Sequence, residues 1–159
     1  SLSCVTDPIT TDKEHPYSHA AYTYGAQVVV LGEDAKVEKV YAAYDAGQVI
    51  NLKSAEGQVE GGVVMSLGYA LTEDYPLIDC VPQARYAKLG LFCANAVPDI
   101  DVKFVCAPVK ADTAYGAKGI GEIASIPTAP AVAGAYFKLD GKMRTSLPLE
   151  GTPYRKQGK

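Results

Sequence analysis

The segment GAKGIGE at residues 116–122 combines closely spaced glycines with a single carboxylate, Glu122, at its end. Glycine has no Cβ, so a glycine-rich backbone can adopt positive φ angles and approach another molecule closely. The Pro- and Ala-rich run at residues 123–135 predicts a helix entrance, which places Glu122 where a loop leads into a helix. A lone acid on such a loop suits a base beside a buried cofactor. A glycine turn with a solvated glutamate accounts for these residues equally well.

A second segment, SAEGQVEGGVVMSLGYA at residues 54–70, has the pattern of a helix with one apolar face. Ser54 is its predicted N-cap, and Glu56 lies in the predicted first turn, where a carboxylate complements the helix dipole. Helical spacing puts four apolar residues on the expected core side, namely Val59, Val63, Leu67 and Ala70. Gln58, Gly62 and Met65 lie on a different side.

Glycines are unusually frequent in this predicted helix, and each costs about 1 kcal/mol relative to alanine in a helix interior. That cost indicates a face that another body approaches closely. The body could be a neighbouring helix or a ligand, and the Gln58 amide could both donate to a ligand and accept from it.

Composition restricts the class of protein. A chain of 159 residues with 48% hydrophobic and 21% charged residues is typical of one globular domain or part of one. The net charge of −3 argues against binding to nucleic acid or to an anionic membrane. No apolar run reaches the length of a transmembrane helix, and the first residues do not resemble a signal peptide. These features predict a cytoplasmic protein.

Cysteine spacing also favours a cytoplasmic protein. Cys4, Cys80, Cys93 and Cys106 form no C-x-x-C pair, which argues against a zinc ribbon or an iron–sulfur cluster within this chain. Scattered thiols without an export signal favour the reduced state of the cytoplasm.

Other mechanistic motifs fit poorly. Gly119-x-Gly121-x-x-Ala124 matches the form of a dinucleotide fingerprint, but no strand is predicted directly before it, and Glu122 would put negative charge beside a pyrophosphate. His15 and His19 are separated by Pro16, which disfavours a helix that would present both to a metal. We therefore predict no protein ligand to a metal.

The predicted fold class is α+β, a mixed sheet with a few packed helices in a single domain covering residues 1–159. Residues 1–14 form an irregular lead-in. The predicted strands are a hairpin of a buried strand at residues 22–31 and a return strand at 36–44, and a third strand at 101–107. A helix is predicted at residues 128–139, capped by Thr128 and ended by Asp140-Gly141.

Four stretches together resemble a known family. They are HPYSHAAYTYGAQVVVL at residues 15–31, VYAAYDAGQVIN at 40–51, EGQVEGGVVMSLGYALTED at 56–74 and YGAKGIGEIASIPTAPAVAGAYFKLDG at 115–141, followed by SLPL at 146–149. The chain resembles the C-terminal part of the molybdopterin-binding subunit of the xanthine dehydrogenase and aldehyde oxidase family, the molybdenum hydroxylases, and most of all the bacterial purine-type enzymes.

The resemblance implies roles for the two informative segments. Glu122 would be the general base that takes the proton from a metal-bound hydroxyl, whose oxygen attacks an electron-poor carbon of a purine, another N-heterocycle or an aldehyde. Gln58 would hydrogen-bond the molybdenum–pterin cofactor. The cofactor would also lie against the loop formed by Lys118, Gly119, Ile120 and Gly121.

The resemblance also implies partners. The family's cofactor lies between this region and a larger preceding part of the same subunit, and iron–sulfur and flavin subunits or domains carry the electrons away. The isolated chain would then be an inactive fragment of an oxidoreductase of purine metabolism. Residues 44–48, Tyr-Asp-Ala-Gly-Gln, depart from the family's expected His-Asp-Val-Gly-Lys. A non-catalytic assembly or binding module that retains the fold is the alternative.

Overall fold

The computed structural model of the chain describes residues 12, 14, 23–85, 88–105 and 114–155. The predicted lead-in at residues 1–14 and the histidine pair lie almost entirely outside these residues. The elements, in chain order, are β1 (Gly25–Leu31), β2 (Val37–Tyr44), α1 (Leu52–Leu71), β3 (Leu77–Ile78), β4 (Val81–Pro82), η2 (Ala94–Ala96), β5 (Asp99–Phe104), η3 (Ala114–Gly116) and α2 (Thr128–Asp140). The α+β prediction is confirmed.

The main sheet has the strand order β1-β2-β5. The predicted hairpin is present, with β1 antiparallel to β2. Strand β5 pairs in parallel with β2 and begins at Asp99, two residues before the predicted start. A parallel pair needs a long crossover connection, and this one contains α1.

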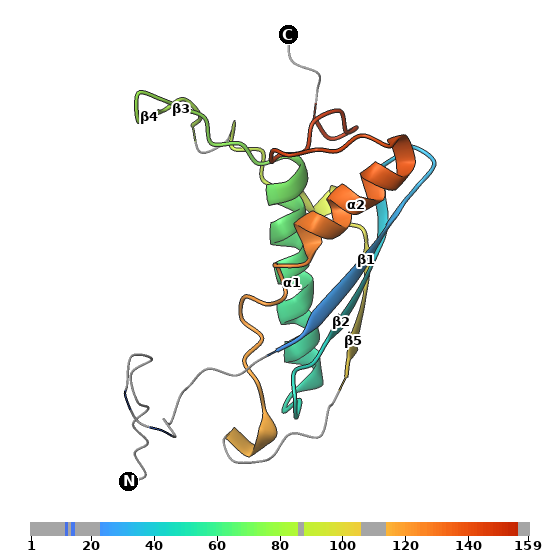
Figure 1. The fold of residues 1–159 in the computed structure, drawn as a ribbon, viewed down its shortest axis with the longest axis vertical. Coiled ribbons are helices and arrows are strands. Elements are labelled where there is room, and N and C mark those ends of the chain that lie inside the picture. Colours follow the sequence, from blue (N-terminus) through green and yellow to red (C-terminus); the bar gives the residue numbers. More distant parts are fainter. Residues whose placement is uncertain (1–11, 13, 15–22, 86–87, 106–113, 156–159) are drawn as a thin grey trace.

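The prediction that residues 22–31 form a buried strand is wrong in its burial. Side chains of β1 alternate between half-buried and exposed, and Val28 is 61% exposed. The reason is that β1 lies at the sheet edge, and only one of its faces contacts α2 (Figure 1).

Helix α1 confirms the predicted core face but begins earlier than expected. Val59, Val63, Leu67 and Ala70 are fully buried. The N-cap is Asn51, whose side chain accepts a hydrogen bond from the Ser54 N–H at 3.0 Å. The predicted Ser54 cap is therefore wrong, and Glu56 lies beyond the first turn. Asparagine and serine cap helices about equally well, so their side chains alone did not distinguish the two starts.

Helix α2 ends as predicted at Gly141, which adopts the left-handed conformation with φ of 70°. The predicted Thr128 cap is wrong. The preceding Pro127 already has helical angles because residues 121–127 form continuous turns, so Thr128 begins the helix and offers no cap. The buried Thr128 Oγ1 has no hydrogen-bond partner among the described residues.

The core lies between one face of the sheet and the two helices. Helix α2 crosses α1 and contacts β1, and α1 contacts β5 (Figure 1). The largest buried side chains include Tyr44 from β2 and Tyr136 from α2. The small β3–β4 hairpin projects away from this body (Figure 1).

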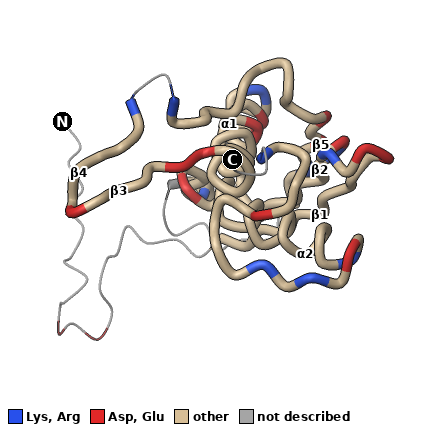
Figure 2. The backbone as a smooth tube through the Cα atoms, turned by 90° about the horizontal axis from the view of Figure 1, so that it is seen from above, with Lys and Arg blue, Asp and Glu red and all other residues tan. Residues whose placement is uncertain are grey.

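Acidic and basic residues are interspersed along the described backbone (Figure 2), in line with the small net charge. Within the described part of the chain, no helix is long and apolar enough to cross a bilayer.

Candidate functional site

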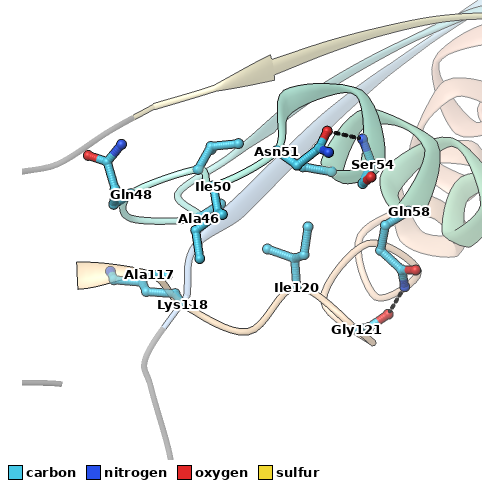
Figure 3. Close-up of a pocket in the computed structure, with 12 residues that line it drawn as sticks. Ala46, Gln48, Ile50, Asn51, Ser54, Gln58, Ala117, Lys118, Ile120 and Gly121 are labelled. Atoms are coloured by element: carbon cyan, nitrogen blue, oxygen red, sulfur yellow. Dashed lines mark hydrogen bonds between the residues drawn. The ribbon is translucent and has the colours of Figure 1, made fainter. Parts of the chain in front are cut away.

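A pocket of about 420 Å³ lies where the start of α1 meets two loops. One loop follows β2 and supplies Ala46 and Gln48, and the other is the glycine-rich segment after η3 (Figure 3). Of the six predicted site residues, four line this pocket: Gln58, Lys118, Ile120 and Gly121. Gly119 lies between two of them in the chain, and Glu122 follows directly after the last.

Gln58 lies on the side of α1 that the core does not cover, as predicted. Its Nε2 donates a hydrogen bond to the Gly121 carbonyl oxygen at 2.8 Å (Figure 3). Gly62 was predicted on the same side of the helix as Gln58. Unlike Gln58 it is buried, and it lies against the turn after the glycine-rich loop. A Cβ built on Gly62 would lie 2.6 Å from the Ala124 Cβ. The close approach that the helix glycines predicted is therefore, at Gly62, an approach of this chain's own backbone.

The glycine-rich loop presents bare backbone at the edge of the pocket. A Cβ built on Gly119 or Gly121 would meet no described atom within 4 Å. The backbone N–H groups of residues 119–122 donate to no acceptor within the described part of the chain. This loop therefore combines room for a ligand with donors that a ligand could use.

The Lys118 ammonium is paired within the chain and does not stand free. It contacts the Asp45 Oδ2, and the two side chains are only 14% and 10% exposed. The Lys118 N–H donates to the Ala46 carbonyl oxygen at 3.0 Å. The Lys118 hydrogen bond, together with one from the Gly47 N–H, holds the pKa of the Asp45 carboxyl below its ordinary value.

Gly47 allows the two loops to lie against each other. It has φ of 60° and forms an isolated bridge with Ala117, and a Cβ at this position would clash with the Gly116 carbonyl oxygen. That oxygen accepts the Gln48 N–H at 2.9 Å. Only glycine meets both requirements, the left-handed backbone and the close contact.

Glu122 lies in the turns at residues 121–127, just before α2, and its side chain is exposed. Its backbone oxygen accepts hydrogen bonds from Ser125, from the N–H at 3.0 Å and from the Oγ at 2.8 Å. On one side, the Gly121 oxygen is bound by Gln58. On the other side, the Ala124 oxygen accepts the Tyr44 hydroxyl at 2.9 Å and the Gln27 Nε2 at 3.1 Å. The glutamate therefore extends from a backbone that is anchored on both sides.

Sequence reasoning did not identify Gln27, Tyr44, Asp45 and Gly47 as parts of the site. Tyr44 departs from the pattern His-Asp-Val-Gly-Lys expected at residues 44–48, whereas Asp45 and Gly47 agree with it. An aspartate followed two residues later by glycine is a signal for a turn in which the carboxylate accepts the glycine N–H, and that contact is present at 3.0 Å. No comparable signal indicated that Tyr44 reaches Ala124.

The pocket residues fit an organic cofactor that carries hydrogen-bonding and anionic groups. The N–H groups of residues 119–122, which donate to no acceptor among the described residues, are donors to such groups, and the space beside Gly119 and Gly121 gives access to them. The Gln58 amide oxygen, whose partner nitrogen already binds Gly121, adds an acceptor.

Comparison with known proteins adds evidence of ancestry. Residues 4–83 match the family model described as a molybdopterin cofactor-binding domain, a range that includes Gln58 and ends before the glycine-rich loop. The chain is 33% identical over 141 residues to a probable xanthine dehydrogenase subunit of Bacillus subtilis, covering 82% of this chain and 18% of that protein.

Two further relatives differ in the substrates that their names give. The aldehyde oxidoreductase of Megalodesulfovibrio gigas is 26% identical over 133 residues, which cover 83% of this chain and 14% of that protein. The solved structure of quinoline 2-oxidoreductase from Pseudomonas putida 86 has a TM-score of 0.65 and 26% identity, over 71% of this chain and 15% of that one. The chain therefore spans less than a fifth of the length of these relatives.

Proposed function

Because the chain belongs to the molybdopterin cofactor-binding domain family, we propose that it is part of an oxidoreductase that hydroxylates a purine, another N-heterocycle or an aldehyde. The names of the relatives support an oxidoreductase and include substrates of more than one kind. In this proposal residues 1–159 form one domain segment of a larger cofactor-binding subunit. The complete enzyme is cytoplasmic and includes the remainder of that subunit, together with iron–sulfur and flavin partners that remove electrons.

The cofactor is held, in part, by the pocket at the start of α1. Gln58 supplies its side-chain amide, and residues 118–121 supply backbone N–H groups and the clearance of the two glycines. The Lys118 ammonium is committed to Asp45, so Lys118 contributes its backbone. When bound, a molybdenum–pterin cofactor supplies the two-electron redox chemistry of the reaction.

Glu122 is the general base. Its carboxylate accepts the proton that a water-derived hydroxyl must lose before the oxygen attacks an electron-poor carbon. The observation that carries this assignment is the double anchoring of its backbone, by Gln58 at Gly121 and by Tyr44 at Ala124. A base contributes to the rate only when it is held within hydrogen-bond reach of its proton, and a fixed backbone beside the cofactor pocket supports such a role for Glu122.

The test is Glu122→Gln in the molybdenum-loaded enzyme that contains this chain. The amide is close in shape to the carboxylate but cannot accept the proton, so turnover should fall by about 10²–10⁴-fold or more while molybdenum content stays the same. Glu56→Gln and Glu60→Gln on α1 are the matched controls and should retain most of the activity. Turnover near the wild-type value in Glu122→Gln would remove this residue from the mechanism and favour a non-catalytic assembly module.

A further inference from the structure

The end of strand β2 contacts residues 118–124, which we call the Glu122 loop, at two separate points. Tyr44 is the last residue of the strand and Asp45 follows it. Tyr44 binds the loop after the glutamate, at Ala124, and Asp45 binds it before the glutamate, at Lys118. Two consecutive residues thus hold both sides of residues 118–124.

The contact made by Tyr44 is buried and closely packed. The tyrosine is 1% exposed, and its hydroxyl donates to the Ala124 oxygen at 2.9 Å. Ala124 is itself fully buried, against Gly62 of α1. Gln27 from β1 donates both to this oxygen and to the tyrosine hydroxyl. A hydrogen bond inside such packing fixes the position of the carbonyl because no water competes for it.

The contact made by Asp45 is an ion pair with little exposure to solvent. One carboxylate oxygen meets the Lys118 ammonium, and the other accepts the Gly47 N–H at 3.0 Å. The Lys118 backbone is bound as well, because its N–H donates to the Ala46 oxygen at 3.0 Å. The attraction between two charges is stronger away from water, and removing one partner is costly because the other charge is left buried and unpaired.

We propose that Tyr44 and Asp45 are positioning residues that fix the two ends of the Glu122 loop relative to the cofactor pocket. We call the Tyr44–Ala124 hydrogen bond and the Asp45–Lys118 ion pair the clamp. The importance of the loop for catalysis rests on the proposed function, whereas the clamp itself does not. The clamp predicts that loss of either contact loosens one end of the loop only. It also predicts that the loss reduces catalysis rather than substrate binding.

Tyr44→Phe and Asp45→Asn remove one contact each with little change of shape. In Asp45→Asn the amide oxygen can still accept the Gly47 N–H, so the variant isolates the ion pair.

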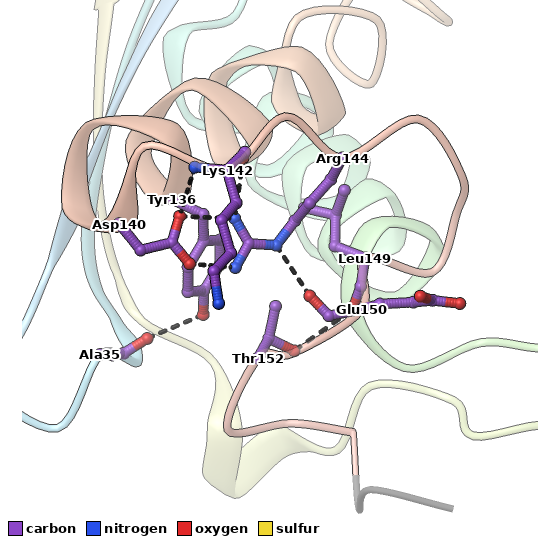
Figure 4. Close-up of polar contacts among 8 residues, drawn as sticks. All are labelled: Ala35, Tyr136, Asp140, Lys142, Arg144, Leu149, Glu150 and Thr152. Atoms are coloured by element: carbon purple, nitrogen blue, oxygen red, sulfur yellow. Dashed lines mark hydrogen bonds and ion pairs between the residues drawn. The ribbon is translucent and has the colours of Figure 1, made fainter.

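The chain provides matched controls for both variants. Tyr136 is also 1% exposed, and its hydroxyl donates to a backbone oxygen, that of Ala35, at 2.7 Å (Figure 4). Asp140 pairs with Arg144 and accepts the N–H of the residue two positions later, as Asp45 does (Figure 4). Tyr136→Phe and Asp140→Asn therefore remove the same chemistry outside the loop.

The measurement is amide hydrogen exchange resolved by residue in the 159-residue chain. Tyr44→Phe should speed exchange about tenfold at the N–H groups of Ser125 and Thr128, which are bonded within the turn. Asp45→Asn should do so at the N–H groups of Lys118 and Gln48. Each variant should leave the other pair of amides unchanged once global stability is matched with denaturant. Equal exchange in variants and controls, or a uniform rise along the chain, would overturn the clamp.

Kinetics of the holoenzyme then test the link to catalysis. Tyr44→Phe should lower kcat at nearly constant KM, while Tyr136→Phe changes neither. Lys118→Arg should restore what Lys118→Met loses, because it preserves the ion pair with Asp45. Unchanged kcat together with faster local exchange would overturn the positioning role. If Glu122→Gln keeps its turnover, the proposed function fails. If Glu122→Gln loses turnover while Tyr44→Phe keeps its kcat, only the positioning role fails.

Discussion

Gln58 binds the carbonyl oxygen of Gly121 at 2.8 Å, so helix α1 holds the residue that directly precedes Glu122. The bond joins residues 63 positions apart and crosses the edge of the pocket (Figure 3). It also orients the amide, because its nitrogen is committed to the protein and its oxygen is left for a ligand. One side chain can therefore serve the loop and the cofactor together.

Replacing Gln58 with leucine should reduce cofactor loading with little effect on stability. The side chain is exposed, so its loss leaves no buried polar group unpaired in the core. The measurement is molybdenum per protein in the assembled enzyme, with the unfolding temperature alongside. Gln83→Leu is the matched control, because the Gln83 Nε2 also donates to a backbone oxygen at 2.8 Å but lies in the β3–β4 region. Full molybdenum content in Gln58→Leu would exclude a role for this amide at the cofactor.

Two adjacent helix glycines should respond oppositely to alanine. Gly61→Ala should stabilise the chain by up to about 1 kcal/mol, because alanine favours the helix and its Cβ meets no described atom within 4 Å. Gly62→Ala should destabilise it by about 1–3 kcal/mol, because the new Cβ would lie 2.6 Å from that of Ala124. Urea unfolding of the two variants measures both effects. A stabilised Gly62→Ala would mean that the turn after Glu122 is not packed against α1.

The carboxylate of Asp140 should contribute to stability in a pH-dependent way. Arg144 binds it in a bidentate manner at 2.7 and 3.1 Å, and the Lys142 N–H adds a third bond (Figure 4). The Arg144 hydrogen bonds, followed by that of Lys142, lower the pKa of Asp140 to about 2. Because the folded-state pKa lies below the unfolded value of about 3.9, the contribution is complete above that value. It disappears as the pH falls through about 2.

Urea unfolding of the wild type and Asp140→Asn at a series of pH values measures this contribution. The difference between the two proteins should be constant from pH 7 to about 5 and should shrink between about pH 4 and pH 2. A difference that stays constant down to pH 2 would show that the carboxylate charge has no part in it.

The 159-residue chain alone should contain no stoichiometric molybdenum. Its pocket is an open groove formed by one helix end and two loops, and the relatives are more than five times longer than the part matched here. In the proposed function, the remainder of the cofactor-binding subunit would supply the other walls of the pocket. Elemental analysis of the purified chain checks this, and one molybdenum per chain would contradict a shared pocket.

Sequence patterns predicted the features that depend on local chemistry. The apolar face of α1 follows from helical spacing, and the end of α2 follows from a glycine that can adopt positive φ. The motif spacing also indicated the family that the comparisons confirm. The start of α1 was misplaced because Asn51 and Ser54 can cap a helix about equally well. The cap of α2 was misassigned because Pro127 already has helical backbone angles, so Thr128 is the first residue of the helix.

The anchors of the site were not predictable in the same way. Tyr44 and Ala124 are 80 positions apart, and Asp45 and Lys118 are 73 apart, so no local pattern links them. The exposure of β1 was missed for a related reason. An apolar strand has the same sequence whether or not another layer covers its second face, and on β1 the side chain of Val28 is 61% exposed.

The long separation of these contacts has a consequence for folding. The sheet is complete only when β5 pairs with β2. The Tyr44 hydrogen bond forms only when the segment just before α2 has folded against it. Such non-local pairings raise contact order and slow folding because chain entropy is lost before contacts compensate for it. During synthesis the pocket can therefore close only after residue 124 has left the ribosome. Before β5 is synthesised, β2 can pair with β1 but has no partner on its other edge.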